Sequence, residues 1–89
     1  MRKRFFVYVL ATNRAGQVRT YVGWTNDLDA RLAKHNDSRG AKATRGQVWI
    51  LFYAERLKSR VGAMRREWAL KNDRAFRDRL RVSARDVFG

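Results

Sequence analysis

The stretch FFVYVL at residues 5–10 is an unbroken run of aromatic and aliphatic side chains, which favour extended strands. Residues 12–17 (TNRAGQ) have the composition of a turn. A second strand-like run, residues 18–24 (VRTYVGW), follows this turn directly. The two runs therefore predict a β-hairpin whose strands are joined by a rather long loop.

A helix is expected after the hairpin. Asn26 belongs to the residue types that cap helices, and Asp27 and Asp29 would lie in the first turn, where the helix dipole favours negative charge. These residues predict a helix over residues 27–36. The polar and basic segment 37–46, which holds two glycines, predicts a loop.

The second half of the chain predicts one more strand and two more helices. The run VWILFY at residues 48–53 is apolar on both faces, which is typical of a strand covered on both sides, so we expect it to be the central strand. Ser59 predicts the cap of a helix that reaches about residue 71, and Asn72 and Asp73 separate this helix from a short last one. The order β-β-α-β-α-α predicts a small mixed α/β (α+β) fold. We expect a three-stranded mixed sheet with flanking helices, with residues 1–89 as a single domain.

The charge balance points to a polyanionic partner. The chain has 21 Lys and Arg residues against 8 Asp and Glu residues, which gives a formal net charge of +13. A polyanion relieves the repulsion within such a surface, and neutralised phosphates also release condensed counterions. DNA, or else RNA, is therefore the expected partner. A basic face that serves solubility or binds an acidic protein is the alternative.

Missing residue types exclude several classes of site. The chain has no Cys, which excludes disulfides and thiolate metal sites, and its only His, His35, excludes a multi-histidine zinc site. No apolar run is long enough to span a membrane, and the N-terminal residues lead into a strand instead of a signal peptide. We expect a cytoplasmic protein without a membrane partner.

Several charged residues fall on helix faces that otherwise carry apolar side chains. Steps of 100° per residue place Glu67 and Lys71 in the apolar half of the second helix. In the first helix, Arg31 and His35 lie one turn apart on the face of Leu28 and Leu32. A carboxylate, a guanidinium and an imidazole on inward faces suit phosphate chemistry.

Each of these side chains also has a purely structural interpretation. Glu67 and Lys71 are spaced for a local ion pair, and Arg31 is long enough to reach water past its apolar neighbours. His35 fits as a half-buried histidine with its hydrogen bonds satisfied. Tyr8 and Tyr21, on the paired strands, either project together from one face or are ordinary strand aromatics.

The pattern of these residues resembles the GIY-YIG nucleases. Phe6-Val7-Tyr8 and Tyr21-Val22-Gly23 are similar to the paired GIY and YIG tripeptides of that family. Arg31 follows the motif glycine by eight positions, as the essential Arg of the family does, and His35-Asn36 and Glu67 match its His-Asn pair and its metal-binding Glu.

The resemblance extends from about residue 5 to residue 80, and residues 40–46 resemble the small stand-alone branch related to excision-repair and junction-resolving nucleases. The chain departs from the pattern at three positions, and it also has no match for a late Asn that some relatives carry. Phe6 replaces the first glycine, Trp24 lies where some members have Lys, and Ala43 replaces a common aromatic residue.

The resemblance implies a metal-dependent endonuclease that hydrolyses phosphodiester bonds of DNA, selects DNA shape instead of sequence and acts in repair or recombination. Glu67 then binds Mg²⁺ or Mn²⁺, and Arg31 neutralises the developing charge. Tyr21 or Tyr8 takes the proton from the attacking water, and His35 orients that tyrosine or acts as the base itself. Phosphate contacts are expected from six basic residues: Arg39, Lys42, Arg45, Arg65, Arg66 and Lys71.

Two functions from other classes compete with this hypothesis. A small basic protein can bind nucleic acid without cutting it, in which case Glu67 and Lys71 only pair with each other. The chain can also be an inactive accessory subunit with a protein partner in a repair complex.

Overall fold

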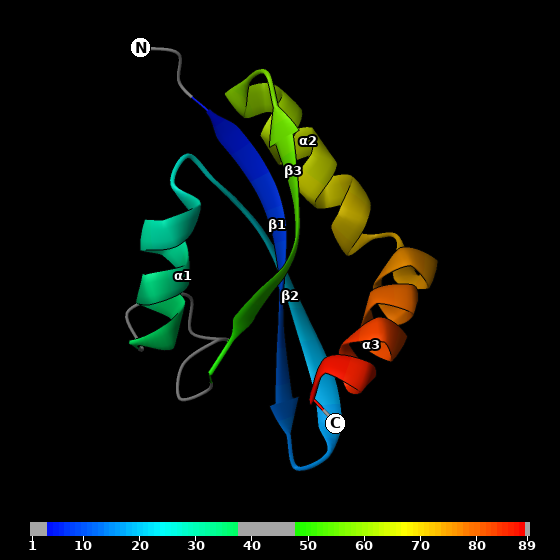
Figure 1. Ribbon diagram of the computed structural model, residues 1–89. Helices are drawn as coiled ribbons and strands as arrows, with labels where there is room; N and C mark the ends of the chain where they lie inside the picture. The colour runs from blue at the N-terminus through cyan, green and yellow to red at the C-terminus, as the bar shows by residue number, and fades with distance from the viewer. Residues whose placement is uncertain (1–3, 38–47, 89) are drawn as a thin grey trace.

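The computed structural model describes residues 4–37 and 48–88, and it confirms the predicted order β-β-α-β-α-α (Figure 1). The elements are β1 (Phe5–Arg14), β2 (Gln17–Thr25), α1 (Leu28–Asn36), β3 (Ile50–Leu57), α2 (Arg60–Lys71) and α3 (Arg74–Phe88).

The three strands form one sheet in the order β2-β1-β3. Both pairings are antiparallel, so the sheet is antiparallel throughout instead of mixed. The prediction that residues 48–53 form the central strand is wrong, because β3 is an edge strand and β1 is central. The sequence contains two continuous apolar runs, residues 5–10 and 48–53, and either is apolar enough for a central strand. Only β1 is buried along six consecutive residues, Val7–Thr12, whereas Leu51 and Ala54 of β3 are exposed.

The hairpin turn is shorter than predicted. β1 continues to Arg14 and pairs there with Gln17, so the connection consists of Ala15 and Gly16 alone. These two residues have φ angles of 52° and 80°. Two-residue turns with positive φ match the right-handed twist of the flanking strands. The strands can therefore pair up to this short turn, so Thr12, Asn13 and Arg14 become part of β1 and Gln17 part of β2.

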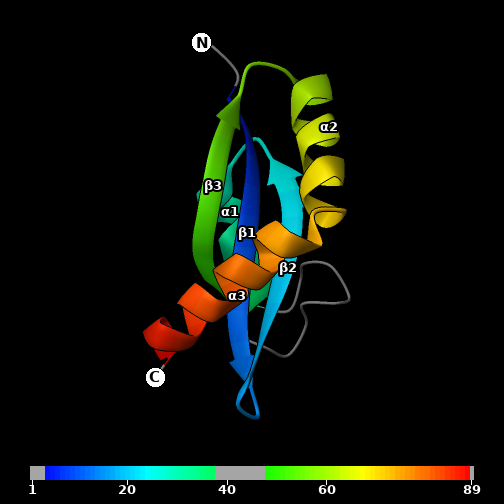
Figure 2. The ribbon, with the colours of Figure 1, turned by 90° about the vertical axis from the view of Figure 1, so that its right-hand side faces the viewer.

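The helices lie on both faces of the sheet. Figures 1 and 2 show α1 on one face and α2 and α3 on the other. Because side chains alternate between the faces of a strand, β1 contributes to two apolar layers. The layer under α2 and α3 is built from Val7, Val9, Val22, Ala63 and Leu70, and the layer under α1 from Tyr8, Leu10 and Trp49.

The helix boundaries follow local capping. Ser59 caps α2 as predicted, because its side chain accepts a hydrogen bond from the Gly62 N–H at 3.0 Å. The cap of α1 is Asp27, one residue later than predicted, with Oδ1 accepting from the Ala30 N–H at 3.1 Å. α3 is the longest helix, at 15 residues, and not short as predicted. Its segment contains no Gly or Pro to end it earlier. Within the described residues no helix combines the length and apolarity needed to cross a bilayer.

Candidate functional site

A cavity of about 360 Å³ opens where the end of β2, the start of α1 and the side of α2 meet. Tyr8, Tyr21, Gly23, Arg31 and Glu67 all line it. They come from β1, β2, α1 and α2, so residues up to 59 positions apart in the sequence reach one space. The sequence predicted these five residues as candidates, and the fold brings them together.

Tyr8 and His35 form a buried pair behind the cavity. Both side chains are about 1% exposed, and the Tyr8 hydroxyl lies 3.1 Å from His35 Nε2 in a hydrogen bond. Burial raises the pKa of Tyr8 to about 12, although the Arg31 guanidinium partly offsets this effect. Burial and the positive charge of Arg31 both lower the pKa of His35. The pair is therefore neutral near pH 7, with Tyr8 protonated.

Tyr21 lies closer to solvent than Tyr8. It is half-buried, and its ring packs against His35 with 5.0 Å between the ring centroids. The ring of Trp49 contacts Tyr21 edge-on at 6.4 Å. His35 and Trp49 thus fix the orientation of the Tyr21 ring, while the residue still lines the cavity.

Gly23 lets the Tyr8 side chain pass across β2. The two residues are opposite each other in the β1–β2 pairing. A Cβ atom at position 23 would lie 2.4 Å from the Tyr8 hydroxyl oxygen and 2.6 Å from its Cζ. Only glycine leaves room for the tyrosine there, because such contacts are far shorter than van der Waals separation. Gly23 therefore shapes the cavity through the space that it leaves open.

Arg31 brings a positive charge to the cavity from α1. The residue is half-buried, and its Nε is inaccessible to water and donates to no acceptor among the described residues. A buried N–H without an acceptor is costly, and a bound anion near this guanidinium offsets part of that cost. Lys34, one turn further along α1, adds a second positive charge at the cavity wall.

Glu67 is the carboxylate of α2 that lines the cavity. Its side chain is 22% exposed, and Oε1 accepts a hydrogen bond from Lys71 Nζ at 3.1 Å. Only part of the predicted apolar half of α2 is buried. Val61, Met64 and Trp68, which the prediction placed in that half, are 57%, 51% and 69% exposed. Ala63 and Leu70, which the prediction placed there too, are fully buried, and Glu67 is half-buried. The buried face of α2 is therefore one side of the predicted half, and Glu67 lies on that side as expected.

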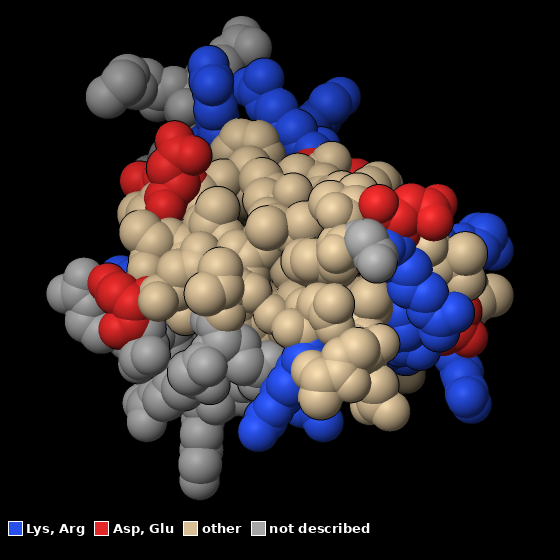
Figure 3. Space-filling view, turned by 60° about the horizontal axis from the view of Figure 1, so that its bottom comes forward, with Lys and Arg blue, Asp and Glu red and all other residues tan. Residues whose placement is uncertain are grey.

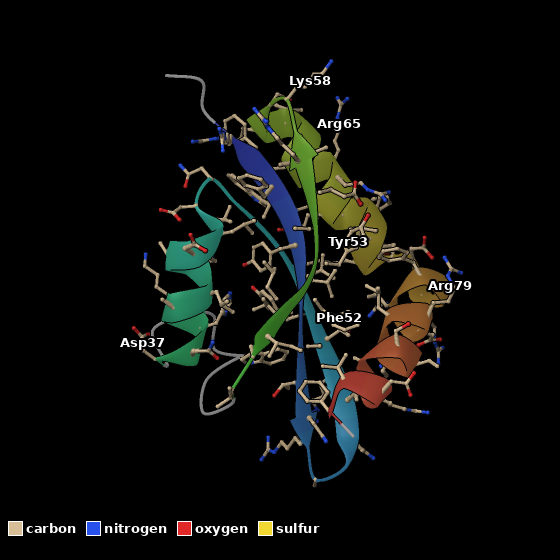
Figure 4. The ribbon with its side chains drawn as sticks, in the orientation of Figure 1. Asp37, Phe52, Tyr53, Lys58, Arg65 and Arg79 are labelled. Atoms are coloured by element: carbon tan, nitrogen blue, oxygen red, sulfur yellow. The ribbon has the colours of Figure 1, made fainter. Side chains whose placement is uncertain are left out.

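Three other predicted residues, Arg65, Arg66 and Lys71, do not line the cavity. The Arg66 guanidinium donates to both carboxylate oxygens of Glu55 at 2.9 and 3.0 Å, which joins α2 to β3. Arg65 points away from the sheet at the outer side of α2 (Figure 4). Lys71 is exposed and paired with Glu67. Arg39, Lys42 and Arg45 lie outside the described residues.

Asn36 has a structural position at the end of α1. Its amide group donates to the Trp49 carbonyl at 3.0 Å and accepts from the Trp49 N–H at 2.6 Å. This pair of hydrogen bonds imitates a strand pairing and ties α1 to the segment that leads into β3. Because Trp49 in turn contacts Tyr21, Asn36 supports the cavity indirectly.

Arg60 is a residue of the cavity that the sequence reasoning missed. It lies over the Trp24 ring, with 5.7 Å from Cζ to the ring centroid, and both residues line the cavity. The sequence could have indicated Arg60 through its spacing from Glu67. The two residues are seven positions apart, about two helical turns, and therefore lie on the same side of α2. With Arg31 and Lys34, Arg60 gives the cavity three positive charges.

The donor atoms present fit one kind of metal site. Among residues 4–37 and 48–88, no three His, Cys, Asp or Glu side chains are grouped to hold an ion between them. Glu67 offers one carboxylate, whereas the Asp27 carboxylate at the same cavity already caps α1. Mg²⁺ and Mn²⁺ prefer oxygen ligands, and Mg²⁺ often keeps several waters and binds substrate phosphates. The cavity thus fits an ion held by one carboxylate and not a closed protein cage.

The chain is similar in sequence to a known catalytic domain and to proteins of several organisms. Residues 4–79 match the profile of the GIY-YIG catalytic domain. A UPF0213 protein of Natronomonas pharaonis is 38% identical over 77 residues, which cover 84% of this chain and 87% of that protein. A UPF0213 protein of Streptococcus sanguinis is 38% identical over 72 residues, with 80% and 79% coverage. One of Bacillus licheniformis is 40% identical over 67 residues, with 74% and 66% coverage. No solved structure gives a significant match.

Proposed function

Because this chain belongs to the GIY-YIG catalytic-domain family, we propose that it is an endonuclease that hydrolyses phosphodiester bonds of DNA with one divalent metal ion. Residues 1–89 act as a single domain in this proposal. The enzyme selects DNA shape instead of base sequence and serves repair or recombination, in keeping with the resemblance to excision-repair and junction-resolving nucleases.

One observation carries the proposal. The carboxylate of Glu67, the guanidinium of Arg31 and the phenol of Tyr21 line the same cavity although they come from three different elements. Hydrolysis of a phosphodiester requires charge neutralisation at the phosphoryl oxygens, a proton acceptor for water and stabilisation of the leaving oxygen. These three side chains match those requirements in one space.

Arg31 neutralises the phosphate in this mechanism. Its planar guanidinium is able to donate two parallel hydrogen bonds to phosphate oxygens. Arg60 and Lys34, at the same cavity, attract the anionic backbone and hold it near Arg31. Such contacts orient the scissile bond without reading bases.

Tyr21 is the proposed acceptor of the proton from the attacking water. Tyr8 stays protonated and serves as a hydrogen-bond donor. Burial, which raises the pKa of Tyr8 to about 12, keeps that residue protonated. Tyr21 is more exposed, and its ring is oriented by His35. His35 acts through Tyr8 and Tyr21 and not as the base, because it is buried and bonded to Tyr8.

Glu67 would hold the metal ion, and Lys71, which is now paired with Glu67, would then be free to contact a phosphate. A bound Mg²⁺ or Mn²⁺ supplies Lewis-acid stabilisation of negative charge on oxygen.

The test is a nicking assay on single-stranded, nicked, flapped and branched DNA with Mg²⁺ or Mn²⁺ and with EDTA. Glu67→Gln removes the carboxylate charge at nearly unchanged volume, and we expect cleavage to fall at least about a hundredfold. Asp86→Asn, at an exposed carboxylate of α3, is the matched control and should cut like the wild type. Cleavage by Glu67→Gln at the wild-type rate would exclude this metal site.

The ion pair between Glu67 and Lys71 favours one alternative function. In a binding module this pair is only structural, and Arg31 is one more phosphate contact. The chain then binds DNA or RNA equally well with and without EDTA and produces no strand scission. An accessory subunit, in contrast, leaves DNA intact and binds a specific protein partner.

A further inference from the structure

A second recess, of about 470 Å³, lies between the start of β2 and one side of α3, outside the cavity described above. Gly16 of the hairpin turn and residues 17–20 of β2, Arg19 among them, form one wall, which we call the β2 wall. Arg77, Arg81 and Arg85 form the α3 wall. We refer to this recess as the arginine groove. None of these residues lines the cavity of Glu67.

The three arginines form a row along α3. They recur every four residues, so they lie on one side of the helix about 6 Å apart along its axis. The opposite wall, β2, is an edge strand of the sheet. The groove therefore lies at one edge of the sheet, between that edge and the row of arginines.

The positive charges of the row are mostly uncompensated. Among the described residues, Arg77 and Arg85 form no ion pair, and Arg81 pairs with Asp78 at 2.9 Å. The Nε atoms of Arg77 and Arg81 are inaccessible to water and have no acceptor in that part of the chain. Arg77 and Arg85 thus carry the unpaired charges of the row, and Arg81 shares its charge with Asp78. On the face drawn in Figure 3, Asp and Glu form small separate groups, and Lys and Arg gather at the upper, right and lower borders.

We propose that the arginine groove binds the phosphate backbone of the nucleic acid at a distance from the scissile bond. Evenly repeated guanidiniums fit a ligand with evenly repeated anionic groups, and each guanidinium is able to contact two phosphate oxygens. The net charge of +13 favours a polyanion as the occupant over a peptide with scattered acidic residues. This inference rests on the proposed function, because it names a second contact surface for the same substrate.

The experiment compares two double variants that each remove two positive charges. Arg77→Gln with Arg85→Gln removes the two arginines of the row that form no ion pair among the described residues, while Arg19 of the β2 wall stays in place. Lys58→Gln with Arg79→Gln is the matched control, since both residues are exposed and neither lines the groove (Figure 4). Affinity for single-stranded and duplex oligonucleotides is measured in EDTA over a series of salt concentrations, so that no cleavage occurs.

We expect the groove variant to bind about tenfold or more weakly than the wild type, with a salt dependence reduced by about 2 in the slope of log K against log salt. The control should lose much less in both. Equal losses in the two double variants overturn the proposal. So does a groove variant that keeps its oligonucleotide affinity and loses binding of polyglutamate, since the occupant is then an acidic polypeptide. Single Arg85→Gln against single Lys58→Gln repeats the comparison at exposed positions, and urea unfolding of both variants checks that they fold alike.

The same variants separate this proposal from the nuclease activity. If the wild type never cuts DNA but the groove variant alone loses affinity, the arginine groove stands and the proposed function fails. If the wild type cuts with Mg²⁺ but the groove variant binds like its control, the nuclease proposal stands and the groove is not a nucleic-acid site.

Discussion

Gly23 shows how one missing side chain determines the shape of the cavity. The Tyr8 ring passes over it at a distance that no Cβ atom tolerates. Tyr8 in turn reaches His35, so that the small residue on β2 allows a contact between β1 and α1. The absence of a side chain at position 23 thus allows the Tyr8 phenol to reach His35.

Gly23→Ala should therefore lower both stability and cleavage. The added methyl pushes the Tyr8 ring away, and overpacking of this kind costs about 1–3 kcal/mol of unfolding free energy. Urea unfolding measures the stability, and the nicking assay measures the activity. Gly16→Ala is the matched control, because its Cβ meets nothing within 4 Å and only its positive φ of 80° is strained. Equal loss of cleavage in the two variants would contradict the role of Gly23.

The raised pKa of Tyr8 makes stability depend on alkaline pH. Its pKa is about 12 in the folded chain and about 10 when unfolded, so unfolding releases a proton between these values. The contribution is complete below pH 10 and is lost as the pH rises toward 12, by up to about 2–3 kcal/mol. Unfolding free energies measured at about pH 9 and about pH 11 should differ less in Tyr8→Phe than in the wild type. An unchanged difference would mean that Tyr8 is not desolvated.

At the scale of elements, α2 carries Glu67 and Arg60 to the cavity, and its N-terminus is set by one hydroxyl. Ser59→Ala removes the acceptor of the Gly62 N–H and should cost about 1 kcal/mol of unfolding free energy. Ser83→Ala, at an exposed position inside α3, is the control and should be neutral or slightly stabilising. Thermal or urea unfolding of both variants tests the cap, and an equal effect at both positions would contradict it.

Element order was predictable from the sequence, whereas strand position was not. Continuous apolar runs and a capping serine identified β1, β3 and α2, because these signals are local. β1 is central because both of its edges pair with another strand, β2 on one side and β3 on the other. The apolar runs of β1 and β3 are alike in composition, so the sequence does not show which of them pairs on both edges. The two-residue turn was missed because strand pairing overrode the turn preference of Thr12 and Asn13.

Predictability of the site divides in the same way. Tyr8, Tyr21, Arg31 and Glu67 were identified because a spaced pattern of chemical groups survives in the sequence. Arg60 and the arginine groove were not identified from the sequence, because the role of an arginine depends on which residues surround it in the folded chain. With 21 basic residues in the chain, the sequence offers no means to rank them.

At the scale of the whole molecule, positive charge occurs at two separate recesses. The cavity of Glu67 has Arg31, Arg60 and Lys34 in its walls, and the arginine groove has a row of guanidiniums on α3. β2 borders both recesses, one near each end of the strand. A nucleic-acid strand that occupies both therefore follows the β2 edge of the sheet.

The central position of β1 also has a consequence for how the chain is made. β1 meets β2 across a two-residue turn, but its other neighbour is reached only when Phe5 pairs with Leu57. The hairpin closes within microseconds, whereas the second pairing must close a much longer segment of chain. On the ribosome, β1 is complete well before β3 emerges. Its free edge stays open to wrong partners during that interval, so misassembly of the nascent chain is most probable there.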